Sequence, residues 1–489
     1  MPRYARSFVV ALIAAMAFLS CFVPAFYEPD EGRYAEIGRE MLLHGDFLVP
    51  RYEGAERMTK PPFTYWTSAI GIGLFGTHPF GARFFGALAG FATVLIAGGI
   101  ARELASPRVA VATMVVLGTS LYGFVGQHFL STDVFLTFWQ ALAALLALKA
   151  LRDPSPARAR WFSRGSWLAL GGAFLTKGPP GLFVLTGILA LTFARHRDRR
   201  RVILDPVALV GFVVVALSWY LATVLRDPER LRYFLVDEVW NRVATKVHDR
   251  NHSPLLYLGI LTLGLTPWIR PLVDLLRDVT GWARSGRPRL SDAAFFAAWW
   301  IIPSLIVFTL SRSRMILYLQ PILVPFAFAI ARAADAALER RRPEAPPAGA
   351  WARGLLVFWC AVLLVAQWQG RELGRGGPYA SAAAAIRADG AGSDFQILNA
   401  TGNRVGSISL LADAPRPTIA LARKSLLKGK EPVSVQMESP VARHRTYLIF
   451  KSEEIPASAA GRTIYSGRRL TVLRHDEGER FEKDEETPR

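Results

Sequence analysis

The residues best suited to chemistry follow the first apolar stretch of the chain. The segment EPDEGRYAEIGREML places Asp30 and Glu31 beside Arg33 where that stretch ends. Carboxylates next to hydrocarbon are costly unless they are paired, hydrated or functional. Acidic side chains at a helix start are also favoured by the helix dipole. We prefer this structural interpretation for Glu28 and Glu36, and we expect Asp30 to be functional.

A lysine follows in the segment MTKPPFTYW. Two prolines fix an extended backbone directly after Lys60, and three aromatic residues suited to a membrane interface come next. A lysine at headgroup level can extend its ammonium group into water. It can equally bind a phosphate as a point charge. The motif alone leaves both roles open for Lys60.

Further ionisable residues stand near the ends of later apolar stretches, in STDVF, FLTKGP, the loop RYFLVDEVWNRVATKVHDRNHSP and SRSRMILYLQP. An isolated residue of this kind usually caps a helix. Together they predict one outward cavity with carboxylates and several cations, suited to an anionic lipid phosphate. Its candidate residues are Asp133, Lys177, Glu238, Arg242, His248, Arg250, Arg312 and Arg314.

The elements that carry these residues are expected to be membrane-spanning helices. Hydrophobic residues make up 52% of the 489 and the mean hydropathy is +0.25, with apolar residues in long runs. Runs of about 18 residues suffice to cross the hydrocarbon core. We predict an all-α polytopic fold of about eleven spans, with the first helix retained rather than cleaved. The expected spans are 7–26, 80–101, 108–126, 132–151, 165–177, 180–195, 204–225, 255–276, 292–310, 316–334 and 353–369.

The distribution of arginine predicts which ends of the spans face the cytoplasm. With the N-terminus inside, every inner segment is short and rich in arginine, as in RHRDRRR at 195–201. Nearly every other ionisable residue close to hydrocarbon then maps to the outer side. The net charge of +19 is therefore explained by membrane orientation, and we expect no nucleic acid partner.

Domain organisation follows from this topology. Residues 1–369 form the membrane domain, with outer loops at 27–79 and 226–254. Short β-branched segments and a helical SAAAAIRA predict a small outer α/β domain over 370–475, and 476–489 reads as a disordered charged tail. The two cysteines, Cys21 and Cys360, lie in apolar runs and offer neither metal spacing nor an evident disulfide.

The motifs, in this order, resemble those of bacterial GT-C type glycosyltransferases that use lipid-linked sugars. That group includes the lipid A aminoarabinose transferase and, more distantly, protein O-mannosyltransferases. The resemblance covers roughly residues 7–335. It implies an inverting transfer of a sugar from polyprenyl (undecaprenyl) phosphate to an acceptor such as lipid A, another envelope glycan or a protein. The expected location is the periplasmic face of the bacterial inner membrane.

The resemblance also implies roles for individual residues. Asp30 resembles the acid proposed to assist catalysis as a base, and Lys60 resembles the lysine that holds the carrier phosphate. Weaker assignments to phosphate neutralisation are Arg33, Arg242, Arg250, Arg312 and Arg314, and those to the cavity or acceptor are Glu31, Asp133, Lys177, Glu238 and His248. The chain departs from the aminoarabinose type at Asp237-Glu238-Val239, where that type carries Glu-Glu-His. The sugar therefore stays open.

The expected chemistry requires no cofactor, because a sugar 1-phosphate ester is already activated and needs positioning, charge stabilisation and a base. A bound divalent metal is an alternative that no ligand spacing supports. Two other functions compete. A glycolipid transporter or flippase favours ionisable residues at mid-span, and a non-catalytic envelope assembly subunit predicts that Asp30 is dispensable.

Overall fold

The computed structural model describes residues 3–234, 236, 253, 255–286, 289–311, 314–341, 350–374, 376–399, 401, 405–420, 444–453 and 461–476. The chain divides into two compact units. Unit 1 comprises Met1–Ser20, Thr59–Phe63 and Gly86–Val365. Unit 2 comprises Cys21–Met58, Thr64–Phe85 and Ala366–Arg489.

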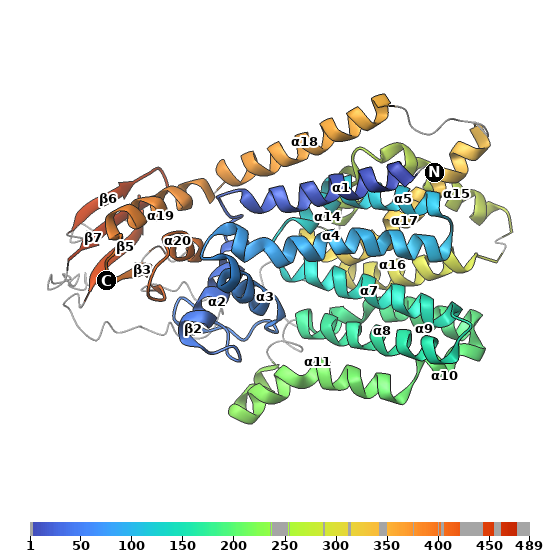
Figure 1. The fold of residues 1–489 in the computed structure, drawn as a ribbon, viewed down its shortest axis with the longest axis horizontal. Coiled ribbons are helices and arrows are strands. Elements are labelled where there is room, and N and C mark those ends of the chain that lie inside the picture. The colour runs from blue at the N-terminus through green and yellow to red at the C-terminus, as the bar shows by residue number, and fades with distance from the viewer. Residues whose placement is uncertain are drawn as a thin grey trace. The chain divides into compact units, whose positions relative to one another are not determined.

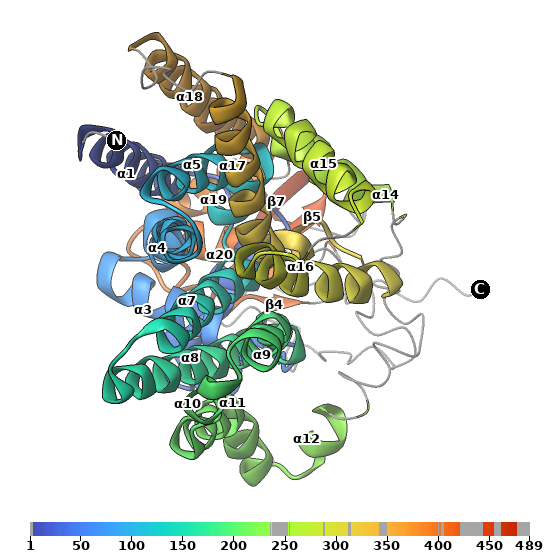
Figure 2. The same cartoon turned by 90° about the vertical axis from the view of Figure 1, so that its right-hand side faces the viewer.

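Unit 1 is a bundle of helices. Its long helices run side by side in Figure 1, and Figure 2 views α7, α8 and α9 end-on as neighbours. Its elements are α1 (Arg3–Leu19), α4 (Pro79–Leu104) from residue 86 on, α5 (Pro107–Thr119), α6 (Leu121–Gln127), α7 (Thr132–Arg152), α8 (Pro156–Lys177), η2 (Pro179–Leu182), α9 (Phe183–Arg195), η3 (Arg197–Arg199), α10 (Arg200–Ile203), α11 (Pro206–Arg226), α12 (Glu229–Arg232), α14 (Leu255–Thr262), η5 (Leu263–Leu265), α15 (Ile269–Arg284), α16 (Asp292–Leu310), η6 (Ile316–Leu319), α17 (Gln320–Arg341) and α18 (Ala350–Glu372) up to residue 365.

The predicted polytopic architecture is confirmed in its helices. Seven described helices are long and apolar enough to cross a membrane, and the pair α5 and α6, bent by 73°, is an eighth candidate. Their starts carry ordinary signals: the Ser131 hydroxyl caps α7, and proline opens α5, α8 and α11. The total of eleven spans stays a prediction.

One predicted span is not a single helix. Residues 255–276 do not form a continuous helix, because α14 ends at Thr262 and a turn with Pro267 separates it from α15. Proline has no backbone N–H to donate and interrupts the helical ladder. Along α15, Arg270, Asp274 and Arg277 form ion pairs at i,i+3 and i,i+4 spacing, so this helix has a charged face.

Charge is segregated along the bundle. α7 has Asp133 in its first turn and Arg152 in its last. At the Arg152 end, arginines join neighbouring helices through side-chain ion pairs and bonds to backbone oxygens. These contacts are Arg108–Asp335 (2.8 Å), Arg164–Asp205 (2.7 Å), Arg340–Asp278 (3.1 Å), Arg199 to the Asp153 carbonyl (3.1 Å) and Arg195 to the Leu290 carbonyl (3.0 Å).

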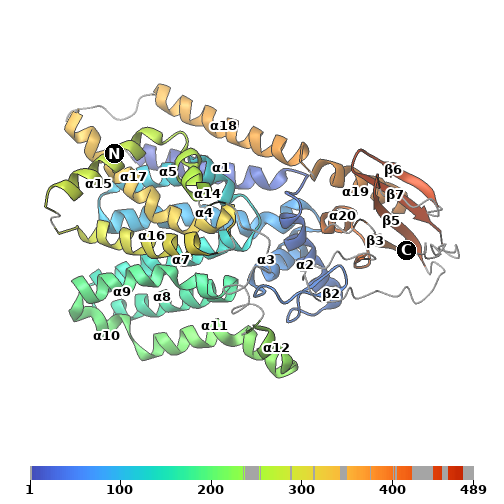
Figure 3. The same ribbon diagram turned by 180° about the vertical axis from the view of Figure 1, so that it is seen from behind.

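Unit 2 combines helices with a small sheet (Figure 3). Its elements are η1 (Ser20–Phe22) from residue 21 on, α2 (Asp30–His44), β1 (Arg51–Tyr52), β2 (Ala55–Glu56), α3 (Phe63–Phe75) from residue 64 on, the first residues of α4, the last residues of α18, α19 (Gly376–Gly390), β3 (Phe395–Asn399), α20 (Gly406–Leu411), β4 (Ile419–Ala420), β5 (Arg445–Lys451), β6 (Arg462–Ser466) and β7 (Leu470–His475).

The C-terminal sheet confirms the predicted α/β region. Its strand order is β4-β3-β5-β7-β6, with β3 parallel to β4 and β5, and β7 antiparallel to β5 and β6. Helices α19 and α20 pack on one face, where Ile386 and Ile408 meet Ile397, Tyr447 and Val472. The segments FQILNA, RPTIALA, RTYLIF and RRLTVL contain four of the strands. Strand β6 was not predicted, because its side chains are largely exposed and lack an apolar face.

The predicted outer loop at 27–79 contains more structure than the sequence indicated. The helix start indicated by the acidic motif is confirmed, since α2 begins at Asp30, and its residues from Glu31 to Met41 are all buried. The apolar helix α3 was missed, because its 13 residues are too short to span a membrane. It packs closely on the start of α4: a Cβ placed on Gly71 would lie 2.1 Å from the Gly81 carbonyl oxygen.

A buried ion cluster holds the start of α2. The Glu31 carboxylate, with 0% of its side chain exposed, pairs with Arg83 (3.0 Å) and Arg371 (3.2 Å) and accepts the Tyr27 N–H (2.9 Å). Arg83 also donates to backbone oxygens, among them that of Ala25 (2.6 Å). Breaking a buried pair leaves an uncompensated charge. Glu31 therefore joins α2 to the first turns of α4 and the end of α18.

Helix α2 also packs against α20. Gly32 permits this approach, since a Cβ there would lie 2.2 Å from Glu28 Oε1 and 2.7 Å from Ser407 Cβ. Burial raises the pKa of the Glu28 carboxyl from 4.5 to about 8, although the neighbouring Ser407 hydroxyl opposes the rise. Glu28 is thus held mainly as the neutral acid at pH 7.

Replacing Glu31 should destabilise the protein. In Glu31→Gln the two arginines lose their shared carboxylate, and we expect a loss of about 3–5 kcal/mol of unfolding free energy, seen as a lower Tm in detergent. Glu56→Gln, at a half-exposed hairpin position, should leave Tm unchanged. An unaltered Tm in Glu31→Gln would show that the cluster does not stabilise unit 2.

Replacing Glu28 should change how stability depends on pH. Between about pH 4.5 and 8 this acid is ionised in the unfolded chain and neutral in the folded one, so it lowers stability progressively as pH rises. Glu28→Gln should therefore flatten the fall in Tm from pH 5 to pH 8.5, whereas Glu339→Gln, at an exposed position, should follow the unmodified protein. Parallel curves for all three proteins would contradict the buried neutral acid.

Candidate functional site

The first turn of α2 presents an acid and an arginine together. Asp30 Oδ1 lies 2.8 Å from Arg33 Nη2, and 31% of the Asp30 side chain is exposed, whereas that of Arg33 is 9% exposed. The Arg33 guanidinium lies 5.0 Å from the Tyr34 ring centroid, and Tyr34 stacks on Tyr65 at 5.7 Å. Arg33 thus holds the Asp30 carboxylate in place while leaving it accessible.

The two neighbouring acids differ sharply in environment. Sequence reasoning assigned Glu31 to the cavity, but its carboxylate is enclosed by Arg83 and Arg371. Asp30 keeps solvent access one residue away. We therefore assign Glu31 a role in positioning α2, and we retain Asp30 as the candidate reactive acid.

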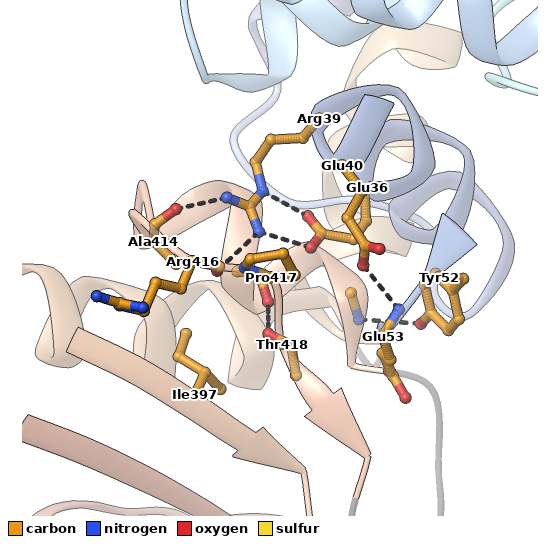
Figure 4. A network of polar contacts seen from close by, with 12 residues as sticks. Glu36, Arg39, Glu40, Tyr52, Glu53, Ile397, Ala414, Arg416, Pro417 and Thr418 are labelled. Carbon is orange, nitrogen blue, oxygen red and sulfur yellow. Dashed lines mark hydrogen bonds and ion pairs between the residues drawn. The ribbon is translucent and has the colours of Figure 1, made fainter. Parts of the chain in front are cut away.

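A second network fixes the middle of α2 to the segment between α20 and β4 (Figure 4). Arg39 makes two bonds to the Glu36 carboxylate (2.8 and 2.7 Å) and donates to the Ala414 carbonyl oxygen (2.5 Å). All three polar groups are buried, so each bond satisfies a group that water cannot reach. The C-terminal region is therefore bonded directly to the helix that carries Asp30 and Arg33.

The β1–β2 hairpin completes this network. Its tip, Glu53 and Gly54, has φ values of +52° and +76°, as a two-residue hairpin turn requires. The Glu53 carboxylate accepts bonds from Asn399 (3.2 Å) and the Val405 N–H (3.2 Å). Its backbone N–H donates to Glu40 (2.7 Å). These bonds offset the left-handed conformation of Glu53, which costs roughly 1–2 kcal/mol.

Glu40 is the acid on α2 whose carboxylate accepts the hydrogen bond from the hairpin. Burial, reinforced by the nearby Glu36, raises the pKa of the Glu40 carboxyl to about 8. The Tyr52 hydroxyl, on the same hairpin, accepts the Gly406 N–H at 3.1 Å. The Glu53 N–H, the Glu53 carboxylate and the Tyr52 hydroxyl thus anchor the hairpin to α2, β3 and the start of α20. These bonds fix the position from which the chain continues after β2.

A separate polar cluster lies in unit 1, at the bundle end opposite the arginine contacts. Lys177, in the last turn of α8, forms a buried ion pair with Asp133 in the first turn of α7. The Lys177 ammonium lies 4.3 Å from the Tyr318 ring centroid. The structure therefore brings together two predicted cavity residues that are 44 positions apart.

Lys60 also belongs to unit 1 and is half-buried. Three residues later, Phe63 packs edge-on against Phe135 and Trp139 of α7, with centroid distances of 5.5 Å for both. The Lys60 segment is thus packed on the half of α7 that carries Asp133. Arg314, in the same unit, donates through Nε to the Thr309 carbonyl oxygen at 3.1 Å.

The remaining predicted residues lie outside the part of the chain that the structure describes. They are Glu238, Arg242, His248, Arg250 and Arg312. Within the described part, no group of three or more His, Cys, Asp or Glu side chains could hold a metal ion.

Sequence reasoning missed one cation in unit 2, which lies near Arg33. Arg57 follows β2, and its backbone N–H donates to the Pro50 carbonyl oxygen at 2.7 Å. Its guanidinium carbon lies 6.0 Å from the Tyr52 ring centroid. Its place three residues before Lys60 in the sequence was the available signal.

Comparisons with known proteins agree with these features. Residues 59–221 match the family described as dolichyl-phosphate-mannose-protein mannosyltransferase. The undecaprenyl phosphate-alpha-4-amino-4-deoxy-L-arabinose arabinosyl transferase of Edwardsiella ictaluri is 31% identical over 344 residues, covering 68% of this chain and 60% of that protein. That of Pseudomonas paraeruginosa is 33% identical, covering 69% and 60%. The chain thus matches less than two thirds of the length of these relatives.

Solved structures extend the likeness to nearly the whole chain. ArnT from Cupriavidus metallidurans, bound to undecaprenyl phosphate, has a TM-score of 0.80 at 22% identity and covers 97% of this chain and 98% of its own. The Archaeoglobus fulgidus oligosaccharyltransferase has a TM-score of 0.60 at 13% identity, covering 92% and 70%. The protein is therefore a multi-pass membrane protein with an ArnT-like GT-C fold, and the resemblance to aminoarabinose transferases predicted from its motifs is confirmed.

Proposed function

We propose that this protein is an inverting membrane glycosyltransferase. It transfers a sugar from a polyprenyl phosphate, such as undecaprenyl phosphate, to an acceptor at the periplasmic face of the inner membrane. Lipid A, another envelope glycan and a protein are the candidate acceptors. The observation that carries this proposal is the accessible Asp30 carboxylate, fixed by Arg33 beside the fully buried Glu31.

The proposed reaction is a single displacement at the anomeric carbon. An acceptor oxygen forms a bond to C1 of the sugar while the bond from C1 to the carrier phosphate oxygen breaks. The electron pair of that bond leaves with the polyprenyl phosphate, and the acceptor proton passes to Asp30. A positioned base and fixed cations are the contributions that such a step needs.

Lys60 is proposed to stabilise the departing phosphate. Its segment is packed on α7 through Phe63, which limits where the ammonium group can lie. The buried pair of Asp133 and Lys177 is proposed to shape the cavity in unit 1. Arg33, Arg242, Arg250, Arg312 and Arg314 remain proposed phosphate ligands, and Glu238 and His248 proposed cavity residues.

The periplasmic orientation is part of this proposal. Its support is the segregation of charge along α7, with Asp133 in its first turn and the arginine contacts at its other end. Arginine-rich segments are retained on the cytoplasmic side. The N-terminus is then cytoplasmic, and the opposite bundle end and the C-terminal α/β domain are periplasmic.

Removing the Asp30 charge should abolish transfer. Without a base to accept the acceptor proton, Asp30→Asn should lower turnover by at least about 10²-fold while the protein still binds undecaprenyl phosphate. Mass spectrometry of envelope lipids and glycans from a complemented deletion strain measures transfer. Asp198→Asn, at an exposed position, should restore the product fully. A normal product pattern with Asp30→Asn would support a non-catalytic role.

Removing the Lys60 charge should weaken use of the carrier. A charge-assisted hydrogen bond contributes about 1.5–3 kcal/mol, so Lys60→Ala should raise the KM for the lipid-linked sugar roughly 10- to 100-fold. Lys60→Arg should recover part of this loss. Lys149→Ala, in the last turn of α7, should behave as the unmodified protein. Unchanged kinetics in Lys60→Ala would remove this residue from the phosphate site.

A further inference from the structure

Arg57 is a cation whose donors are incompletely used. Its Nε is buried and has no hydrogen-bond acceptor among the described residues. The Tyr52 ring, 6.0 Å from its guanidinium carbon, offers a cation–π contact at the outer limit of that interaction. A buried guanidinium N–H without an acceptor is costly, so the position favours a further hydrogen-bond acceptor, such as an anionic ligand.

The charges around Arg57 are unbalanced in favour of cations. Burial and the neighbouring Arg33 cation lower the pKa of Arg57, while Tyr52, Tyr34 and Tyr65 oppose this. Arg33 already pairs with Asp30, and the nearby Glu28 carboxyl is held mainly neutral at pH 7. The guanidinium that acts on Arg57 is therefore a like charge, and its own partner is Asp30.

The hairpin fixes where the Arg57 guanidinium can reach. Glu53 binds Asn399 and the Val405 N–H, and the Arg57 N–H closes the hairpin on Pro50. The tip of the hairpin is thus fixed by Glu53, and the strand end that carries Arg57 is fixed by its bond to Pro50. Arginine presents several N–H groups in a planar fork that matches phosphate oxygens, and a fixed backbone reduces the entropy lost when such bonds form.

We propose that Arg57, together with Arg33, binds a phosphate group of one of the two lipid substrates. This inference rests on the proposed glycosyl transfer. That reaction offers two sources of the same chemistry, which are the phosphate of the polyprenyl carrier and a phosphate on a phosphorylated acceptor such as lipid A. In either case Arg57 is a ligand of the anion that positions a substrate beside Asp30.

Direct binding to the full-length protein tests this site without requiring turnover. The probes are undecaprenyl phosphate, the neutral undecaprenol, lipid A and dephosphorylated lipid A, each in detergent. Arg57→Gln should weaken binding of one phosphorylated probe by at least tenfold and leave its phosphate-free counterpart unchanged. Arg57→Lys should recover only part of the loss, because an ammonium group cannot make the forked contact.

A matched control separates this site from general loss of positive charge. Arg416, also in unit 2, is partly exposed and donates through Nε and Nη2 to the Asp394 carboxylate, so Arg416→Gln should bind all four probes normally. Loss confined to undecaprenyl phosphate identifies the carrier, and loss confined to lipid A identifies the acceptor. Normal binding of both phosphorylated probes by Arg57→Gln, at an unchanged Tm, would overturn the proposal.

Two further outcomes also decide the matter. Equal weakening of phosphorylated and neutral probes would overturn the proposal, because it would show that Arg57 acts through packing. In the second outcome, the unmodified protein binds the phosphorylated probe but transfers no sugar, while Arg57→Gln loses that binding. In that case the proposed function fails and the anion site stands.

Discussion

The arrangement of unit 2 depends on a single buried carboxylate shared by two arginines. Glu31 lies between Arg83 and Arg371, which come from segments of the chain hundreds of residues apart. Because each of these charges would be strongly unfavourable alone, separating the three would destabilise unit 2. The start of α2 is therefore fixed from one side by ions and from the other by the packing of Gly32 near Ser407.

This constraint explains why adjacent acids serve different purposes. The Glu31 carboxylate is buried in ion pairs that stabilise the fold, and the Glu28 carboxyl is kept mainly neutral by burial. Of these three acids, Asp30 alone combines an ion pair with solvent access. Arg39, which bonds the Ala414 carbonyl oxygen, and the hairpin at Glu53 bind the same helix to the C-terminal region. The C-terminal region thus contributes to the position of the candidate base, a role that its sequence alone did not indicate.

The sequence predicted features that depend on local pattern and missed those that depend on long-range pairing. Apolar runs located most helices, β-branched segments located four strands, and the acidic motif located α2. The helix break near Pro267 was missed because the residues before it, in α14 and η5, are mostly apolar and read as one continuous run. The partners of Glu31 and Lys177 could not be predicted, since nothing in a single sequence links positions so far apart. For the site, motif resemblance selected Asp30 and Lys60 but passed over Arg57.

The central claim is that Asp30 and Lys60 both act on a lipid-linked sugar at the outer side of the membrane. Site-directed labelling tests it most directly, since Cys21 and Cys360 are buried and can be replaced. Single cysteines at positions 30 and 60 would be treated in intact cells with a membrane-impermeant maleimide. The account predicts that both react from the periplasm and that undecaprenyl phosphate protects them. Labelling only from the cytoplasm, or from opposite sides of the bilayer, would contradict it.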